Sequence, residues 1–224
     1  MKIFLINPNS DPGMTEAILR SAEAYARDDF EVVCRRNPEA PRFIETYEDE
    51  IRTAPGMIKM VRENQGEFDA FVVACHCDPN LDALKEVSQK PVVGIGEASM
   101  RLAAMLGHRF SVISAGRHSI PNKQALVRKY HMEGLLASVR CPVRDLMDTP
   151  EEEQMLDAAR SALRDDGAEV IVLGCAGQAG MDARLHRELG APVLDGVACA
   201  LIVASGLVRA GLAISKVRRY NPGV

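Results

Sequence analysis

Residues 68–75 read Phe68-Asp69-Ala70-Phe71-Val72-Val73-Ala74-Cys75, a short apolar run that ends in a cysteine. The same pattern returns at residues 168–175, which read Ala168-Glu169-Val170-Ile171-Val172-Leu173-Gly174-Cys175. Short continuous apolar runs are typical of strands that are buried on both faces of a parallel sheet. The two runs therefore predict two equivalent strands. Each would place a thiol at its carboxyl end, the edge at which open α/β sheets bind ligands.

The elements around the two runs follow the same order in each half. A further strand with its following turn is predicted at residues 91–96 in the first half and at residues 192–196 in the second. Strands are also predicted at 3–6, 30–33 and 109–114. Helices are predicted at 97–106, 119–130, 182–189 and from 196 onward, and residues 37–55 are expected to form a proline-interrupted loop with a short helix. Strands that alternate with helices favour parallel sheets.

We therefore expect an α/β fold of two similar lobes, each a mostly parallel sheet flanked by helices. The repeated order suggests an ancient duplication, so the lobes should be related by pseudo-twofold symmetry, with the active site in the cleft between them. Residues 1–97 plus 205–224 should form the first lobe and residues 98–204 the second. A chain of 224 residues is long enough for two such modest lobes.

Composition and charge exclude several classes of function. The net charge of −4 gives no basic footprint for nucleic acid or an anionic membrane, and aromatic residues make up only 4% of the chain. The most apolar helical candidate, residues 196–208, is shorter than the ~20 residues of a membrane span. No signal-peptide core is present, because Asn7-Pro8-Asn9 interrupts the apolar start. We expect a cytoplasmic protein whose six cysteines are thiols.

Cys75 and Cys175 are the candidate catalytic residues. A single cysteine at a strand end is usually a packing residue, but two at equivalent strand exits favour function. Two thiols across one cleft can remove a proton from one face of a carbon and return it to the other. The field of helices that begin just after each cysteine would favour the thiolate.

Two other kinds of site are disfavoured. Cys75-His76-Cys77 together with Cys175 could supply four soft ligands for zinc, but the chain has no paired CxxC motif, so we expect no metal. Gly94-Ile95-Gly96 lacks the third glycine of a dinucleotide loop, because Ser99 stands in its place. No cofactor is expected.

Several motifs, in this order, resemble those of the hydantoin and allantoin racemases of the aspartate/glutamate racemase superfamily. They are Ile6-Asn7-Pro8-Asn9-Ser10, Ala74-Cys75-His76-Cys77-Asp78-Pro79-Asn80-Leu81-Asp82, Pro91-Val92-Val93-Gly94-Ile95-Gly96-Glu97-Ala98, Leu173-Gly174-Cys175-Ala176-Gly177 and Pro192-Val193-Leu194-Asp195-Gly196-Val197. The resemblance spans nearly the whole chain. Two departures stand out: His76-Cys77 replaces an aromatic and a small residue, and Gln178 replaces an apolar one.

The resemblance implies cofactor-independent racemisation of a 5-substituted hydantoin or allantoin, with Cys75 and Cys175 as the two bases. It also implies that Asn7 and Asn9 line the site, and that backbone donors come from Gly177 and its neighbours. We assign the substrate-binding positions to Asn7, Asn9, His76, Cys77, Ala176 and Gly177. The expected partner is a small-molecule substrate, and the chain is expected to form a homo-oligomer.

Three alternatives remain at this point. A racemase for free aspartate or glutamate, or a maleate-type cis–trans isomerase, would use the same two cysteines, whereas arylmalonate decarboxylases of this superfamily keep only one. A non-enzymatic small-molecule sensor would need neither thiol. The sequence favours a cyclic ureide, because relatives that racemise free amino acids typically have asparagine and threonine after each cysteine to hold the α-carboxylate. Here Ala176 and Gly177 offer only backbone N–H groups.

Overall fold

Two four-stranded parallel sheets with the same strand order form the framework of the chain. In the computed structural model, which describes residues 1–142, 150–221 and 223, the first sheet has the order β2-β1-β3-β4 and the second β6-β5-β7-β8. The strands of the first sheet are β1 (Lys2–Asn7), β2 (Glu31–Arg36), β3 (Ala70–Val73) and β4 (Val92–Gly94). Those of the second are β5 (Phe110–Ile113), β6 (Leu136–Arg140), β7 (Val170–Leu173) and β8 (Val193–Leu194). The expected α/β class with two similar parallel sheets is confirmed.

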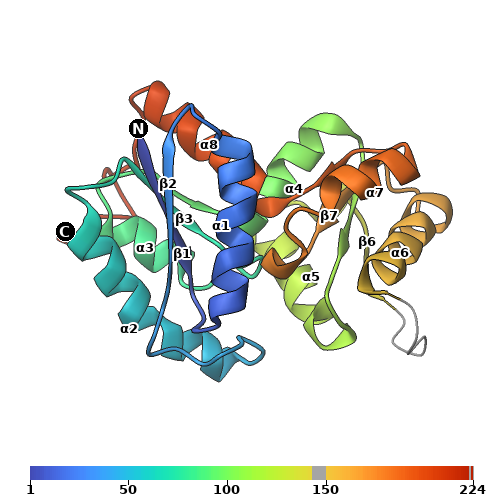
Figure 1. Cartoon of the computed structure of the whole chain (residues 1–224), viewed down its shortest axis with the longest axis horizontal. Coiled ribbons are helices and arrows are strands. Elements are labelled where there is room, and N and C mark those ends of the chain that lie inside the picture. The colour runs from blue at the N-terminus through green and yellow to red at the C-terminus, as the bar shows by residue number, and fades with distance from the viewer. Residues whose placement is uncertain (143–149, 222, 224) are drawn as a thin grey trace. The chain divides into compact units, whose positions relative to one another are not determined.

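Helices connect the parallel strands and flank each sheet (Figure 1). In the first half they are α1 (Pro12–Ala26), α2 (Tyr47–Asn64), α3 (Leu81–Val87) and α4 (Ile95–Leu106). In the second half they are α5 (Ile120–Lys129), α6 (Glu151–Asp165), α7 (Asp182–Leu189) and α8 (Gly196–Arg209). Three short 3₁₀ helices, η1 (Arg117–Ser119), η2 (Glu133–Leu135) and η3 (Ala176–Gln178), complete the described elements.

The chain forms two compact units and passes twice between them. Residues 1–95 and 197–224 make up the first unit, and residues 96–196 make up the second. The sequence pattern placed these crossings at 97/98 and 204/205. Each crossing coincides with the first turn of a helix, because β4 passes directly into α4 and a single residue separates β8 from α8.

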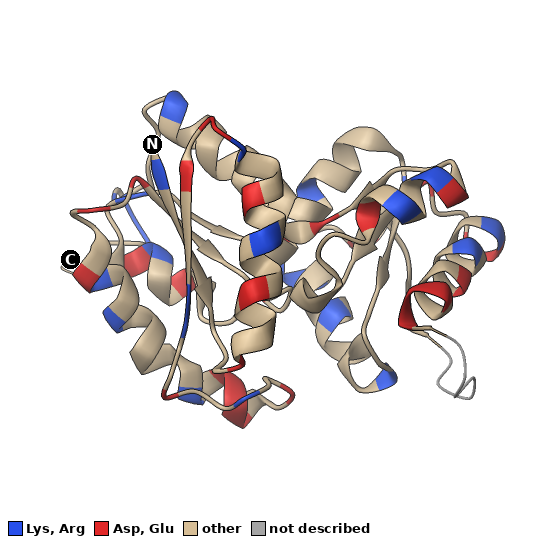
Figure 2. Ribbon diagram, viewed as in Figure 1, with Lys and Arg blue, Asp and Glu red and all other residues tan. Residues whose placement is uncertain are grey.

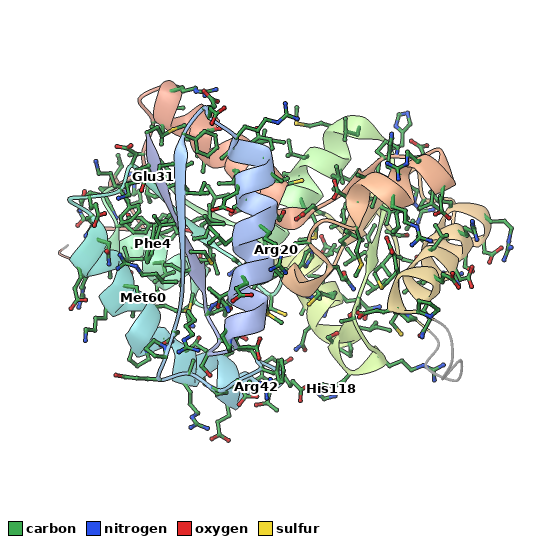
Figure 3. All side chains as sticks on the ribbon, in the orientation of Figure 1. Phe4, Arg20, Glu31, Arg42, Met60 and His118 are labelled. Carbon is green, nitrogen blue, oxygen red and sulfur yellow. The ribbon has the colours of Figure 1, made fainter. Side chains whose placement is uncertain are left out.

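Buried central strands form the core of each unit. The side chains of Ile3, Phe4, Leu5 and Ile6 in β1 are fully buried, as are those of β3 and nearly all of β7. The ring of Phe4, labelled in Figure 3, lies 4.8 Å from that of Phe68 between ring centroids. Burial on both faces explains why these strands are continuous apolar runs in the sequence.

The prediction of a loop with a short helix over residues 37–55 is wrong from residue 47 onward. A single helix, α2, runs from Tyr47 to Asn64 and contains Pro55. The side chain of Thr46 accepts a hydrogen bond from the N–H of Asp49, whose carboxylate accepts one from the N–H of Thr46. This capping box and the burial of Met57 and Val61 offset the hydrogen bond that proline cannot make.

One edge strand of each sheet was poorly predicted from the sequence. β2 extends to Arg36, beyond the predicted residues 30–33, and β6 was not predicted. The residues of both strands are mostly half-exposed or exposed, so the sequence carries neither an apolar run nor a clear alternation there. Within the described ranges, no helix is both long and apolar enough to cross a membrane.

Candidate active site

Each of the two equivalent strands ends in a cysteine at the same structural position. The N–H of Ala74, after β3, donates to the carbonyl of Ile6 at 2.9 Å. The N–H of Gly174, after β7, donates to the carbonyl of Ile113 at 2.8 Å. Cys75 and Cys175 follow directly, and both are half-buried. The strands β3 and β7, which hold the same place in the two sheets, therefore each present one thiol at the carboxyl end.

A turn then closes over each cysteine in the same way. The N–H of Asp78 donates to the carbonyl of Cys75 at 2.9 Å, and the N–H of Gln178 donates to the carbonyl of Cys175 at 3.1 Å. We call residues 74–80 the Cys75 loop and residues 174–181 the Cys175 loop. The shared turn supports the internal repeat inferred from the sequence.

The Cys175 loop places a backbone donor on the thiol. Cys175 is the N-cap of η3, and its Sγ accepts a hydrogen bond from the N–H of Gly177 at 3.4 Å. The preceding position, Gly174, has no room for a side chain, because a Cβ there would lie 2.7 Å from the carbonyl oxygen of Ile113. A donor to sulfur stabilises the thiolate relative to the thiol.

The Cys75 loop differs from the expected strand-to-helix turn. Asp78 and Asn80 both have left-handed backbone angles, with φ of 47° and 56°. The helix α3 starts only at Leu81, and its N-cap, Asn80, makes no side-chain capping bond. The expectation of a helix beginning just after each cysteine is therefore wrong for Cys75, because two left-handed residues turn the chain first.

Asn7 is the last residue of β1, and Asn9 lies in the connection from β1 to α1. The amide of Asn7 is fully buried and donates to Asn9 Oδ1 at 2.8 Å and to Thr15 Oγ1 at 2.9 Å. Asn9 Oδ1 in turn accepts from the N–H of Asp11 at 3.0 Å. The described contacts of Asn7 thus shape the start of α1.

Asp11 fixes the neighbouring loop as well as the helix start. Its side chain caps α1 through the N–H of Met14 and pairs with Arg42 at 2.8 Å. The bond from Met14, followed by that from Arg42, lowers the pKa of Asp11 from its usual value. Together with backbone hydrogen bonds from Asn37 and to Pro41, this pair holds residues 37–42 against the end of β1 at which the asparagines lie.

The other four residues that were expected to bind substrate differ in how far they are exposed to solvent. Cys77 is half-buried and Gly177 is exposed. The side chains of His76 and Ala176 are buried, with exposed fractions of 1% and 5%. Among these four, Cys77 and Gly177 thus present surface to a ligand.

The sequence analysis gave no site role to three buried polar residues in or beside the cysteine loops, although it noted Gln178 as a departure from the family pattern. Asp78 is 2% exposed, Gln178 1% and Asp195 5%. The Oδ2 of Asp195 accepts a hydrogen bond from the N–H of Gly180 at 3.0 Å. A polar side chain next to an apolar strand was the available signal, but an aspartate at that place is also an ordinary turn residue.

The carboxyl group of Asp182 interacts with that of Asp195. Burial, and then repulsion from Asp195, raises the pKa of Asp182 in the first turn of α7. Farther along α7, Arg184 pairs with Glu152 of α6 and with Glu188 of α7. Figure 2 shows basic and acidic residues on both helices. In the described part of the chain, no group of three or more histidine, cysteine, aspartate or glutamate side chains is arranged to hold a metal ion.

Comparison with known proteins finds similarity over almost the whole chain. The family model described as Asp/Glu/Hydantoin racemase matches residues 3–204. A hydantoin racemase of Pseudomonas sp. (strain NS671) is 39% identical over 227 residues, which cover 99% of this chain and 91% of that protein. The crystal structure of allantoin racemase from Pseudomonas fluorescens has a TM-score of 0.91 at 33% identity, covering 98% of this chain and 96% of that one. Allantoin racemase from Klebsiella pneumoniae has a TM-score of 0.90 at 35% identity, with coverages of 97% and 91%.

Proposed function

The chain belongs to the Asp/Glu/hydantoin racemase family, and from this premise we propose that it racemises a 5-substituted hydantoin or allantoin. Cys75 and Cys175 act as the two bases of this reaction. The observation that carries the proposal is the matched pair of half-buried thiols, each at the carboxyl end of an equivalent strand. Similar relatives bear the names hydantoin racemase and allantoin racemase, which supports the choice of substrate.

The chemistry needs only proton transfer. One cysteine, as thiolate, removes the proton from the ring carbon that bears the substituent, and its S–H bond forms as the C–H bond breaks. The electron pair is delocalised into the ring carbonyl as an enolate. The other cysteine, as thiol, then gives its proton to the opposite face of the same carbon. The scheme requires the two thiols to reach opposite faces of one carbon, and each turnover exchanges their protonation states.

The surroundings of the thiols suit a neutral ring. Ala176 and Gly177, which follow Cys175, offer only backbone groups, and the N–H of Gly177 is directed at sulfur. Buried carboxyl groups at Asp78 and Asp195 lie in or beside the two cysteine loops. A cyclic ureide brings no carboxylate of its own, whereas a free amino acid would bring its α-carboxylate close to these buried carboxyl groups. The ureide also acidifies its ring proton, because the enolate is conjugated with the ring.

A substrate panel tests the proposal. We expect stereochemical inversion of a chiral 5-substituted hydantoin or of allantoin, followed by polarimetry, with kcat/KM well above that for aspartate or glutamate. A preference for a free amino acid, or for isomerising maleate, would replace the ureide assignment and keep the two thiols. Absence of turnover on every substrate would favour a binding protein.

We propose in addition that the protein works as a homo-oligomer without metal or cofactor. Sedimentation velocity measures the first point. For the second, activity should survive exhaustive chelation. Loss of activity to the chelator, with recovery on adding zinc, would instead assign a metal site to Cys75-His76-Cys77.

A further inference from the structure

A buried carboxyl group ties each cysteine loop to the end of the next strand of its own sheet. In the first unit the carboxyl group belongs to the loop: Asp78 packs against Gly94, the last residue of β4. In the second unit it belongs to the strand end: Asp195 follows β8 and accepts the N–H of Gly180 in the Cys175 loop. The two halves thus make an equivalent contact, in which the carboxyl group belongs to the loop in the first unit and to the strand end in the second.

The fit at Gly94 is close enough to define a packing requirement. A Cβ at this position would lie 2.3 Å from Oδ1, 2.4 Å from Cγ and 2.7 Å from Oδ2 of Asp78. Any side chain larger than that of glycine would therefore displace the carboxyl group. Asp78 also has the left-handed φ of 47°, which is unfavourable for a residue with a side chain. The loop keeps an aspartate at a position that glycine would occupy with less strain.

The contact in the second unit is a direct hydrogen bond. Oδ2 of Asp195 lies 3.0 Å from the nitrogen of Gly180, whose φ of 86° turns the chain after η3. Because η3 carries the N–H of Gly177 that reaches Cys175 Sγ, holding Gly180 limits movement of the segment that contacts the thiol. Asp195 is 5% exposed, so little water competes for this bond.

We propose that Asp78 and Asp195 are positioning residues, each fixing the loop of the catalytic cysteine in its own unit. The inference rests on the proposed two-base function. Neither carboxyl group touches the reacting carbon in this scheme; each acts by holding a thiol in place. Each connection is made just before the chain crosses into the other unit, at 95/96 and at 196/197.

Matched substitutions test the first connection. Asp78→Ala removes the carboxyl group. Gly94→Ala displaces the carboxyl group without changing any residue of the Cys75 loop. Gly66→Ala is the control, since a Cβ there meets nothing within 4 Å. Asp78→Asn keeps the size of the side chain and should retain most activity. For the second connection we use Asp195→Ala, Asp195→Asn, in which the amide oxygen can still accept the N–H, and Gly134→Ala as the open-space control.

Thiol reactivity gives a readout that does not depend on activity. Rates of alkylation by iodoacetamide are measured at Cys75 and Cys175 separately by mass spectrometry. We expect Asp78→Ala and Gly94→Ala to change the rate at Cys75 by about fivefold or more and that at Cys175 by less than about twofold. Asp195→Ala should do the reverse. Equal changes at both cysteines, or no change at either, would overturn the proposal.

Catalysis gives the second readout. The alanine variants should lower kcat by about tenfold with KM within about threefold, as expected when an aligned base is lost and binding is kept. In deuterated solvent, Asp78→Ala should exchange the ring proton of one enantiomer without inversion, and Asp195→Ala that of the other. Exchange biased to the same enantiomer in both variants would contradict separate control of the two thiols.

The outcomes separate this inference from the proposed function. If the wild-type protein inverts no hydantoin but alkylation stays selective by unit, the function is wrong and the positioning role stands. If the wild-type protein racemises hydantoins and the variants lose activity only in proportion to the fraction unfolded, measured by circular dichroism, the positioning role is wrong and the function stands.

Discussion

The backbone N–H of Gly177 donates to the Sγ of Cys175 at 3.4 Å. The two residues lie within one turn, so the contact depends on local backbone geometry alone. A donor directed at sulfur favours the charged form of the thiol, which is the form that removes a proton. The structure thereby gives a simple source of activation for one of the two proposed bases.

Removing this hydrogen-bond donor should selectively slow the alkylation of Cys175. Gly177→Pro removes the N–H, so we expect the alkylation rate of Cys175 at neutral pH to fall by about threefold to tenfold. Gly177→Ala keeps the N–H at an exposed position and is the control. Alkylation of Cys175 that is equally fast in the proline variant would show that other groups activate the thiol. Circular dichroism checks that both variants fold.

Removing either thiol should abolish inversion and leave the fold intact. Cys75→Ala and Cys175→Ala each leave one base, so we expect less than about a tenth of wild-type racemisation in both. A single remaining thiolate can still exchange the ring proton of one enantiomer in deuterated solvent, and NMR detects this. Substantial racemisation by either variant would exclude the two-base scheme. Cys34→Ala is the control, because burial raises the pKa of the Cys34 thiol to about 12 and makes it a poor base at neutral pH.

The ion pair between Arg140 and Asp166 should make stability depend on pH. Arg140 donates to both carboxylate oxygens of Asp166, at 2.5 and 2.8 Å, and holds the pKa of Asp166 at about 2. Because the native pKa lies below the unfolded one, the stabilisation is present above pH 4 and disappears as pH falls toward 2. We expect Asp166→Asn to lower the free energy of unfolding at pH 7 by about 1–2 kcal/mol, allowing for partial exposure of the pair.

Urea unfolding at several pH values measures this difference. The gap between wild type and Asp166→Asn should close as the medium approaches pH 2, while Asp28→Asn, at an exposed residue, should show little gap at any pH. A gap that stays constant down to pH 2 would mean that packing, rather than the charge, makes the contribution.

The native glutamine at position 178 should make the fold less stable than an apolar residue of similar size would. Its side chain is 1% exposed, Nε2 lies 3.2 Å from Met155 Sδ, and within the described residues Oε1 has no hydrogen-bond partner. Gln178→Met keeps the approximate volume and removes the buried oxygen, so we expect the free energy of unfolding to rise by about 1–2 kcal/mol. Gln89→Met, at an exposed position, is the control and should change it by less than about 0.5 kcal/mol. A loss of stability in Gln178→Met would indicate that Oε1 is satisfied in solution.

The buried centre of each sheet was predictable because its signal is local. Residues 3–6, 70–73 and 170–173 are apolar on both faces, since helices cover both sides of a parallel strand. The cysteines that end two of these runs, and the repeat that relates them, follow from the same pattern. The edge strand β6 escaped prediction, because half-exposed residues need no regular alternation.

The sequence by itself determined the α/β class, the internal repeat and the two thiols, because strand periodicity and strand ends are recorded in consecutive residues. Only the tertiary structure decided how the thiols are held. Asp78 meets Gly94, and Asp195 meets Gly180, through contacts between residues that are far apart in the chain. The continuous helix through Pro55 was likewise decided by a capping box and buried side chains that outweigh the local propensity of proline. Local pattern fixes the buried central strands, whereas packing between distant segments fixes the orientation of the reactive groups at their ends.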